Sequence, residues 1–325
     1  MLIKEVNVSE IIEELKKNKI NSYYFLDELF IDYLQKYNPN SEFEDKSFII
    51  KKDENILYCP ITIQRKNGLK YLNFFGEPCF CIYLKYEDEI FFSFKEKIKE
   101  FFEKEKIYDL NLVFDVSEIN ILNENNLFFE KNLSKKISNI KYINLDLTIK
   151  DIKKGFKKGL KHLLNKDYSS LSYKIIDSVN YSKEISNMKN MHQEVSKKIT
   201  RPDETWMINE KMILSNKGFL VQVDDRKNVI SYSLFFTNGQ EAIYFSSCTL
   251  KKYFKVYKNI SHKSIFEAIK YLKKKESKNL TLGESKVILG DKNLSDKEKN
   301  IFMFKSSFGG EIFTRFYIDK KNLYS

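Results

Sequence analysis

The sequence predicts an α/β protein of the α+β type, with two tandem domains that each contain a mixed, mainly antiparallel sheet flanked by helices. The chain has 325 residues, which exceeds the roughly 100 to 200 residues typical of one domain. One order of extended and helical patterns occurs twice along it. Hydrophobic residues make up 42% of the chain, with only 10 Gly and 4 Pro, which is a globular composition. We place the domains at residues 1–148 and 149–325.

The second half shows the pattern more clearly. It opens with an alternating apolar segment, which predicts a strand, and continues with two helical patterns and three further strands. The turns between the three strands are short and polar, and the second contains Asn238-Gly239, a dipeptide typical of hairpins. We therefore expect an antiparallel meander. The segments are 171–179 (strand), 183–195 and 204–216 (helices), and 218–225, 228–236 and 241–248 (the meander).

A helix is expected after the meander, at residues 261–275. Its apolar residues recur at helical spacing, as in Ile265 and Ile269, and Ser261 is a suitable N-cap. A short buried strand, a helix and a final strand complete this half, at residues 279–284, 297–310 and 311–318.

The first half repeats this order, although the two halves share no clear residue-level identity. Its segments are a strand at 3–8, two helical stretches, a hairpin at 47–64, a strand at 69–76, a helix at 93–106, and strands at 109–116 and 140–149. The prediction of a duplicated domain therefore depends on the order of elements alone.

The net charge of +11 is unevenly distributed, because residues 1–150 carry −4 and residues 151–325 carry +15. A basic half favours an anionic partner, such as a nucleotide, a sugar nucleotide or RNA. Lysine enrichment from AT-rich codons is the alternative, but it should act on both halves.

No apolar run approaches the roughly 20 residues that span a bilayer, and the N-terminal segment lacks the apolar region of a signal peptide. We therefore expect a cytoplasmic protein. Cys59 and Cys248 stand alone, and we expect Cys79 and Cys81, in a predicted strand, to point to opposite faces. All four are expected to be reduced thiols. With only three histidines and no ligand spacing, we expect no metal site.

Five motifs of the second half, and one of the first, carry a resemblance to a known family. They are DIKKGFKKGLKHLLNK (151–166), HQEVSKKITRPDETW (192–206), AIYFSSC, LGES, EKNIFMFKSSFGG and LNFFGEPC (72–79). The order of elements resembles the GNAT-type N-acyltransferase fold. Two such halves in tandem resemble the FemAB group of peptidyl and aminoacyl transferases.

This resemblance implies an enzyme that moves an acyl or aminoacyl group onto an amine. The acceptor would be a sugar nucleotide or another cell-envelope or surface-glycan precursor. The chain lacks the long charged helical arm of the FemA-type pattern, so both aminoacyl-tRNA and acyl-CoA stay open as the donor. Either would act as a co-substrate, and we expect no permanently bound cofactor.

Acyl transfer needs a proton acceptor and donors for the developing oxyanion. We expect Glu284, at the end of a buried strand, to point into the cleft as the base. Tyr244, a further catalytic candidate, lies on the facing strand with Ser246 and Ser247, which we expect to bind substrate. Because alternate residues of a strand face the cleft, the others of this set must face the core. His192 has an ordinary pKa of about 6.5, which suits a proton shuttle, although a helix-face histidine is often only structural.

Substrate contacts are expected from Arg201, Glu204 and Trp206, which combine the only Trp with dense charge. The same residues follow the pattern of a helix N-terminus, so capping is the alternative. The resemblance adds Lys305, which matches the lysine of the family's F-K-x-x-F-G stretch and would hold a phosphate or the donor carbonyl. An exposed helical lysine is the simpler interpretation.

Phosphate binding is expected from Lys154, Lys158 and Lys161 on a helix spanning 151–166. The spacing also fits an amphipathic helix with a solvated basic face.

The loop at 246–262 contains no glycine, so its backbone cannot easily close on the pyrophosphate of coenzyme A. This disfavours acetyl-CoA, although lysines of the loop offer other phosphate contacts. A non-catalytic RNA-binding or partner-binding module is a further alternative, but neither an RNP1 nor a KH motif is present.

Overall fold

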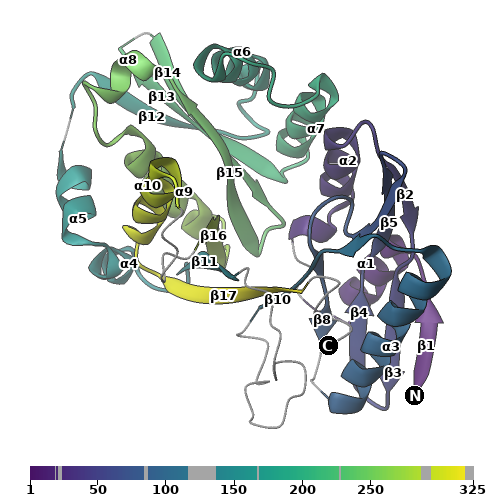
Figure 1. Cartoon of the computed structure of the whole chain (residues 1–325). Helices are drawn as coiled ribbons and strands as arrows, with labels where there is room; N and C mark the ends of the chain where they lie inside the picture. Colours follow the sequence, from purple (N-terminus) through teal and green to yellow (C-terminus); the bar gives the residue numbers. More distant parts are fainter. Residues whose placement is uncertain are drawn as a thin grey trace. The chain divides into compact units, whose positions relative to one another are not determined.

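The computed structural model describes residues 1–18, 20, 24–83, 87–115, 137–166, 168–226, 228–286 and 294–318. The chain forms two compact units whose segments alternate along the sequence. Unit 1 comprises Met1–Ser22, Leu34–Asn139 and Phe313–Ser325, and unit 2 comprises Tyr23–Tyr33 and Ile140–Ile312. Sheets flanked by helices occur in both (Figure 1), so the predicted mixed α/β class is confirmed. Among the described residues, none of the helices combines the length and apolarity needed to cross a bilayer.

Unit 1 contains two four-stranded sheets, ordered β1-β3-β4-β8 and β2-β5-β6-β9. Helix α1 (Val8–Lys17) begins with a capping box between Asn7 and Glu10 and buries Ile11 and Leu15. The prediction of a strand over residues 3–8 is therefore wrong at residue 8, which lies in this helix. The other elements are β1 (Leu2–Glu5), β2 (Glu42–Asp45), β3 (Phe48–Lys52), β4 (Asn55–Cys59), β5 (Thr62–Lys66), β6 (Leu69–Asn73), β7 (Cys79–Phe80), β8 (Ile82–Tyr83), α3 (Asp88–Glu105), β9 (Asp109–Leu110) and β10 (Leu112–Asp115).

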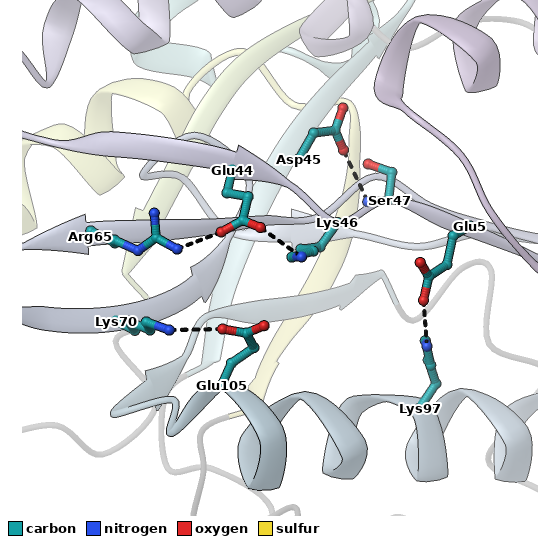
Figure 2. A network of polar contacts seen from close by, with 9 residues as sticks. All are labelled: Glu5, Glu44, Asp45, Lys46, Ser47, Arg65, Lys70, Lys97 and Glu105. Carbon is teal, nitrogen blue, oxygen red and sulfur yellow. Dashed lines mark hydrogen bonds and ion pairs between the residues drawn. The ribbon is translucent and has the colours of Figure 1, made fainter.

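Ion pairs join neighbouring elements on the surface of unit 1 (Figure 2). Glu44 lies between Lys46 at 2.7 Å and Arg65 at 2.6 Å. The hydrogen bond from Lys46 is the main reason that the pKa of Glu44 is lowered. Nearby, Lys97 pairs with Glu5 at 2.9 Å. Because these groups are partly exposed, solvent screens them and each contributes little to stability.

The positions of three cysteines in unit 1 correct one expectation about them. Cys79 and Cys81 do not point to opposite faces, because residues two apart along an extended chain share a face. Both sulfurs lie beside that of Cys59, and the three ligand atoms are within 4.8 Å of one another.

Unit 2 is built on a sheet whose strands run in the order β12-β13-β14-β15-β16-β11. Strands β12 to β15 are antiparallel neighbours, which confirms the predicted meander. Strand β16 joins β15 in parallel after a helical crossover. The strands are β11 (Ile137–Asn144), which begins in unit 1, β12 (Leu171–Ile176), β13 (Gly218–Asp225), β14 (Asn228–Thr237), β15 (Glu241–Thr249) and β16 (Asn279–Lys286).

Helices cover both faces of this sheet (Figure 1). Helix α9 (Ile260–Lys274) packs its apolar stripe on one face, against Phe219 of β13 and Phe235 of β14. Helices α6 (Glu184–Ser196) and α7 (Asp203–Leu214) contact the sheet through β15 and β13. The remaining elements are η1 (Tyr24–Leu26), α2 (Glu28–Tyr37), which ends in unit 1, α4 (Ile149–Gly155), α5 (Lys158–Asn165), α8 (Lys251–Phe254), α10 (Asp296–Ser306) and β17 (Glu311–Ile318), which ends in unit 1.

Strands β15 and β16 pair over only three residues, from Glu241 opposite Asn279 to Ile243 opposite Thr281. Directly after this pairing, a β-bulge shifts the register between β14 and β15, so Phe235 pairs with Tyr244 and Leu234 pairs with Ser246. A bulge bends its strand and redirects side chains. Beyond Ile243 and Thr281, β15 and β16 are no longer paired, and a space opens between them.

The predicted helix over 151–166 is wrong as one piece. Phe156 has an extended backbone (ψ 142°), which divides the segment into α4 and α5. At the break, the Lys157 amide donates to the carbonyl oxygen of Ser307 at 2.9 Å, so a tertiary contact replaces a helical bond. The predicted apolar face is nevertheless present, because Ile152 and Phe156 lie in the same core as α9.

Ser261 does not cap helix α9, since Asn259 is the N-cap and Ser261 lies in the first turn. The Asn259 amide does not cap through its side chain either. Instead its Nδ2 donates to the carbonyl oxygens of Leu163 and Lys166, which ties the helix start to the end of α5.

Residues 24–33 pack with unit 2 although they lie early in the sequence. Phe30 and Tyr33 contact Phe245 of β15 edge-on, with ring centroids 6.1 and 5.2 Å away. Asp27 pairs with Lys217 at 2.7 Å. This segment therefore supports the bulged strand from one side.

Candidate active site

A cavity of about 520 Å³ opens in unit 2 where β15 and β16 part. Its wall combines two strands with the start of α9 and the end of α10, because the interrupted strand pairing leaves this space to side chains from all four elements. Its lining residues are Ile243, Tyr244, Phe245, Ser246, Ser247, Ser261, Leu282, Gly283, Ile301, Phe304 and Lys305. Four residues singled out from the sequence therefore meet here: Tyr244, Ser246, Ser247 and Lys305.

Lys305 supplies the positive charge of this wall. Its Nζ donates a hydrogen bond to the carbonyl oxygen of Glu284 at 2.5 Å, which uses one of the three donors of an ammonium group. Loss of hydration on burial lowers the pKa of Lys305 to about 8, and the charge of Glu284 opposes this effect. At neutral pH the group is still mostly a cation.

Gly283 lies directly against this ammonium. A Cβ on residue 283 would lie 3.4 Å from Lys305 Nζ, and the glycine has a φ of +73° that L side chains rarely adopt. A glycine within the strand pattern LTLGE was a sign of a close approach of this kind.

Glu284 is placed differently from the cavity-lining residues. It is exposed, and its carbonyl, rather than its carboxylate, binds Lys305. Its carboxylate is near enough to raise the pKa of Lys305. The carboxylate therefore lies beside the cavity, and its role as a base stays a prediction.

Tyr244 and Ser247 form a hydroxyl pair on β15. The Tyr244 phenol donates to Ser247 Oγ at 2.6 Å, and burial raises the pKa of the phenol. Tyr244 thus stays protonated at neutral pH and serves as a hydrogen-bond donor rather than as a base. The Ser247 hydroxyl retains its own proton for a ligand.

Arg201 contacts the cavity wall through Ser246. Its Nη2 donates to Ser246 Oγ at 3.2 Å, and its guanidinium carbon lies 4.9 Å from the ring of Trp206 and 5.7 Å from that of Phe245. Nε and Nη1 are buried, and within the described part of the chain they have no hydrogen-bond partner. Burying a guanidinium whose donors lack partners costs free energy unless a ligand or water accepts hydrogen bonds from them.

The other residues of the 192–206 motif have more structural surroundings. His192 shares a hydrogen bond with Thr200 through Nδ1 at 3.1 Å and packs on Trp206. Burial, and then the charge of Arg201, lowers the pKa of His192, so the imidazole is neutral at neutral pH. Glu204 is exposed in the first turn of α7, as the capping alternative also expects.

The three lysines expected to bind phosphate lie outside the cavity wall. Lys154 pairs with Asp151 at 2.7 Å, and Lys161 donates to the carbonyl of Lys154 at 2.8 Å. Lys158 is exposed at the start of α5. None of the three lines the cavity, and their phosphate role stays a prediction.

Sequence reasoning missed several residues of the wall. Phe304 precedes Lys305 and approaches the ring of Tyr244, with centroids 6.5 Å apart. Ile301 lies one turn earlier on α10. No periodic signal reveals them, because the apolar residues of this helix, 301–304, are consecutive rather than three or four positions apart.

Solved structures give the fold of the whole chain. FemX aligns with a TM-score of 0.65 over 100% of this chain and 99% of its own, at 13% identity. The fold is that of FemX. No family model matches the sequence, and no curated protein matches it either.

Two further structures share the FemX-like fold at lower similarity. A tandem GNAT protein from the clavulanic acid biosynthesis pathway aligns with a TM-score of 0.51 at 7% identity, over 98% of each chain. L-PGS from Bacillus licheniformis aligns with a TM-score of 0.50 at 10% identity, over 95% of this chain and 90% of its own. These likenesses confirm the predicted tandem GNAT-like architecture.

Proposed function

We propose that this protein is an N-acyltransferase that moves an acyl or aminoacyl group from an activated donor onto an amine. The observation that carries the proposal is the cavity between β15 and β16, where a half-buried ammonium and a hydroxyl pair face one space. The FemX-like fold and the motif resemblance to the FemAB transferases support it.

In the proposed reaction, the amine nitrogen attacks the acyl carbonyl directly and a new C–N bond forms. Lys305 stabilises the negative charge that develops on the carbonyl oxygen, as preorganised donors do in acyl transfer. The bond from the carbonyl carbon to the donor oxygen or sulfur then breaks. Glu284 is the proposed acceptor of the amine proton, directly or through one water, since its carboxylate lies beside Lys305.

The proposed acceptor carries an anionic group, as a sugar nucleotide or another envelope precursor does. Arg201 is the proposed contact for it, because two of its guanidinium nitrogens lack partners within the described residues and it reaches the cavity wall through Ser246. The charge of +15 in residues 151–325 would attract such a ligand.

The donor is proposed to be an aminoacyl or similar activated acyl group rather than acetyl-CoA. The segment between β15 and α9 contains no glycine, and α8 occupies part of it. Titration with coenzyme A decides this point, together with a double variant of Lys251→Ala and Lys252→Ala. Micromolar binding that depends on these lysines would favour acetyl-CoA instead.

The activity itself is tested by incubating the purified chain with acyl donors and amine acceptors and measuring the acylated product by mass. Lys305→Met should lower the turnover by roughly 100-fold or more, the size of losing one oxyanion donor. Lys297→Met, on the exposed side of the same helix, is the matched control. Equal rates for the two variants would contradict the assignment of this cavity. Glu284→Gln should also slow turnover with an unchanged melting temperature.

A further inference from the structure

Three cysteine sulfurs meet in the interior of unit 1. Cys59 ends β4, Cys79 lies in β7, and Cys81 follows two residues later. Their Sγ atoms all lie within 4.8 Å of one another, and those of Cys59 and Cys81 are 3.8 Å apart. All three side chains are buried, with exposures of 0%, 0% and 4%. The pairing of β4 with β8 holds the two segments together.

This spacing suits a metal ion in the plane of three sulfurs. At a metal–sulfur distance of about 2.3 Å, the corners of such a triangle are about 4 Å apart. The sulfurs are therefore already near the positions that an ion requires. Without a metal, the Cys79 thiol donates to the carbonyl oxygen of Pro60 at 3.1 Å, a bond that is given up when the thiol ionises to bind the ion.

The ligand set points to a soft ion. Thiolates select Cu(I), zinc and iron–sulfur clusters. Structural zinc sites almost always take four ligands, and among the described residues no fourth Cys, His, Asp or Glu joins this group. Three-coordinate binding by sulfur alone therefore favours Cu(I).

We propose that the thiolates of Cys59, Cys79 and Cys81 bind one Cu(I) ion in the core of unit 1. Binding forms three Cu–S bonds, and the protons of the thiols that ionise are released to solvent. No oxidation state changes. The ion would join the end of β4 to residues 79–81, so its effect is on the stability of unit 1, apart from the acyl-transfer cavity in unit 2.

Because the sulfurs are enclosed, the ion is best loaded as the chain folds. The full chain is produced in copper-supplemented cells and purified under reducing conditions, and its copper and zinc contents are measured. We expect about one copper per chain, held against a Cu(I) chelator, as folding-coupled sites hold their metals. X-ray absorption at the copper edge should show three sulfur neighbours at about 2.3 Å.

Single variants test the ligands. Cys59→Ser and Cys81→Ser should each weaken Cu(I) binding by at least about 100-fold, whereas Cys248→Ser should keep it. Cys248 is the matched control, because it is a buried cysteine of unit 2 outside the cluster. Circular dichroism shows whether each variant folds. The sulfur count in the unaltered protein does not depend on the variants.

Several results would overturn the proposal. They are a folded chain without stoichiometric copper, retention of zinc in preference to copper, equal loss of copper in Cys248→Ser, and a sulfur count other than three. A disulfide between Cys59 and Cys81 in the reduced preparation, found by mass spectrometry, would also contradict it, because that bond removes two of the ligands.

Discussion

Lys305 and Gly283 form a close pair in the cavity wall, with the ammonium 3.4 Å from the position that a Cβ on residue 283 would occupy. Gly283→Ala should therefore place a methyl group in van der Waals contact with the ammonium and lower turnover by roughly twofold to tenfold, since it restricts where a reacting group can lie. Gly239→Ala is the control, because Gly239 also has a positive φ (+92°) but open space around it. Both variants carry backbone strain of about 1 kcal/mol. Equal rates in the two variants would show that backbone strain, and not contact with Lys305, lowers the turnover.

The pH dependence should report the ionisation of Lys305. Its pKa is lowered to about 8, so the oxyanion-stabilising cation is lost, and turnover falls, as pH rises through 8. Lys305→Arg should remove this decline, because a guanidinium stays charged at these pH values. A pH–rate profile of both proteins is the measurement, and an identical alkaline limb in the two would assign it to another group.

The same shift has a consequence for stability. The folded-state pKa lies below the ordinary value of 10.5, so the unfolded chain binds more protons between about 8 and 10.5 and stability rises with pH in this window. Lys305→Met should lack this rise. Urea titrations at several pH values measure it.

Arg201 should decide the affinity for an anionic acceptor. Arg201→Met should weaken binding of a nucleoside diphosphate sugar by roughly 10- to 100-fold, the size of a charge-assisted hydrogen bond. Arg226→Met is the control, since Arg226 is exposed beside the turn after β13. Calorimetric titration of both, with thermal melts, separates binding from folding. Unchanged affinity in a folded Arg201→Met protein would place the anion elsewhere.

His262 should make unit 2 sensitive to acid. Its ring lies 4.7 Å from that of Phe304 and 5.8 Å from that of Phe308, and burial lowers its pKa to about 4. The unfolded chain therefore takes up a proton first, so stability is lost as pH falls from about 6.5 towards 4. His262→Phe should flatten the melting temperature over this range, whereas His162→Phe, at an exposed position, should not. Parallel slopes in all three proteins would rule out His262 as the cause.

Local patterns were sufficient to predict most of unit 2. The meander of β13, β14 and β15 followed from alternation and from Asn238-Gly239, because register and turn chemistry are local properties. The break at Phe156 could not be predicted, since the apolar spacing continues through it. The break coincides with contacts to a distant part of the chain. The Lys157 amide donates to the carbonyl oxygen of Ser307, and Gly309 packs so closely on Gly155 that a Cβ on residue 309 would lie 2.2 Å from the Gly155 carbonyl oxygen.

The residues of the candidate site also fall into those that local sequence patterns predict and those that depend on distant contacts. Tyr244, Ser246 and Ser247 could be found because they lie on one predicted strand, and Lys305 because of a motif. The bond from Arg201 to Ser246 joins residues 45 positions apart across a bulge, and no local pattern encodes it. The cysteine cluster was missed because the spacing of 59, 79 and 81 resembles no known ligand motif.

The contacts of Phe30 and Tyr33 with Phe245 on the bulged strand also affect how the chain folds during synthesis. Phe30 and Tyr33 leave the ribosome long before their partner Phe245 is made. At about 5 to 20 residues per second, the delay is roughly 10 to 40 s. Strand β10 likewise waits for β17, whose residues 315–318 pair with residues 112–115. The nascent chain must therefore keep these apolar side chains and one edge of β10 unpartnered while roughly 200 further residues are made, a period in which both are open to aggregation.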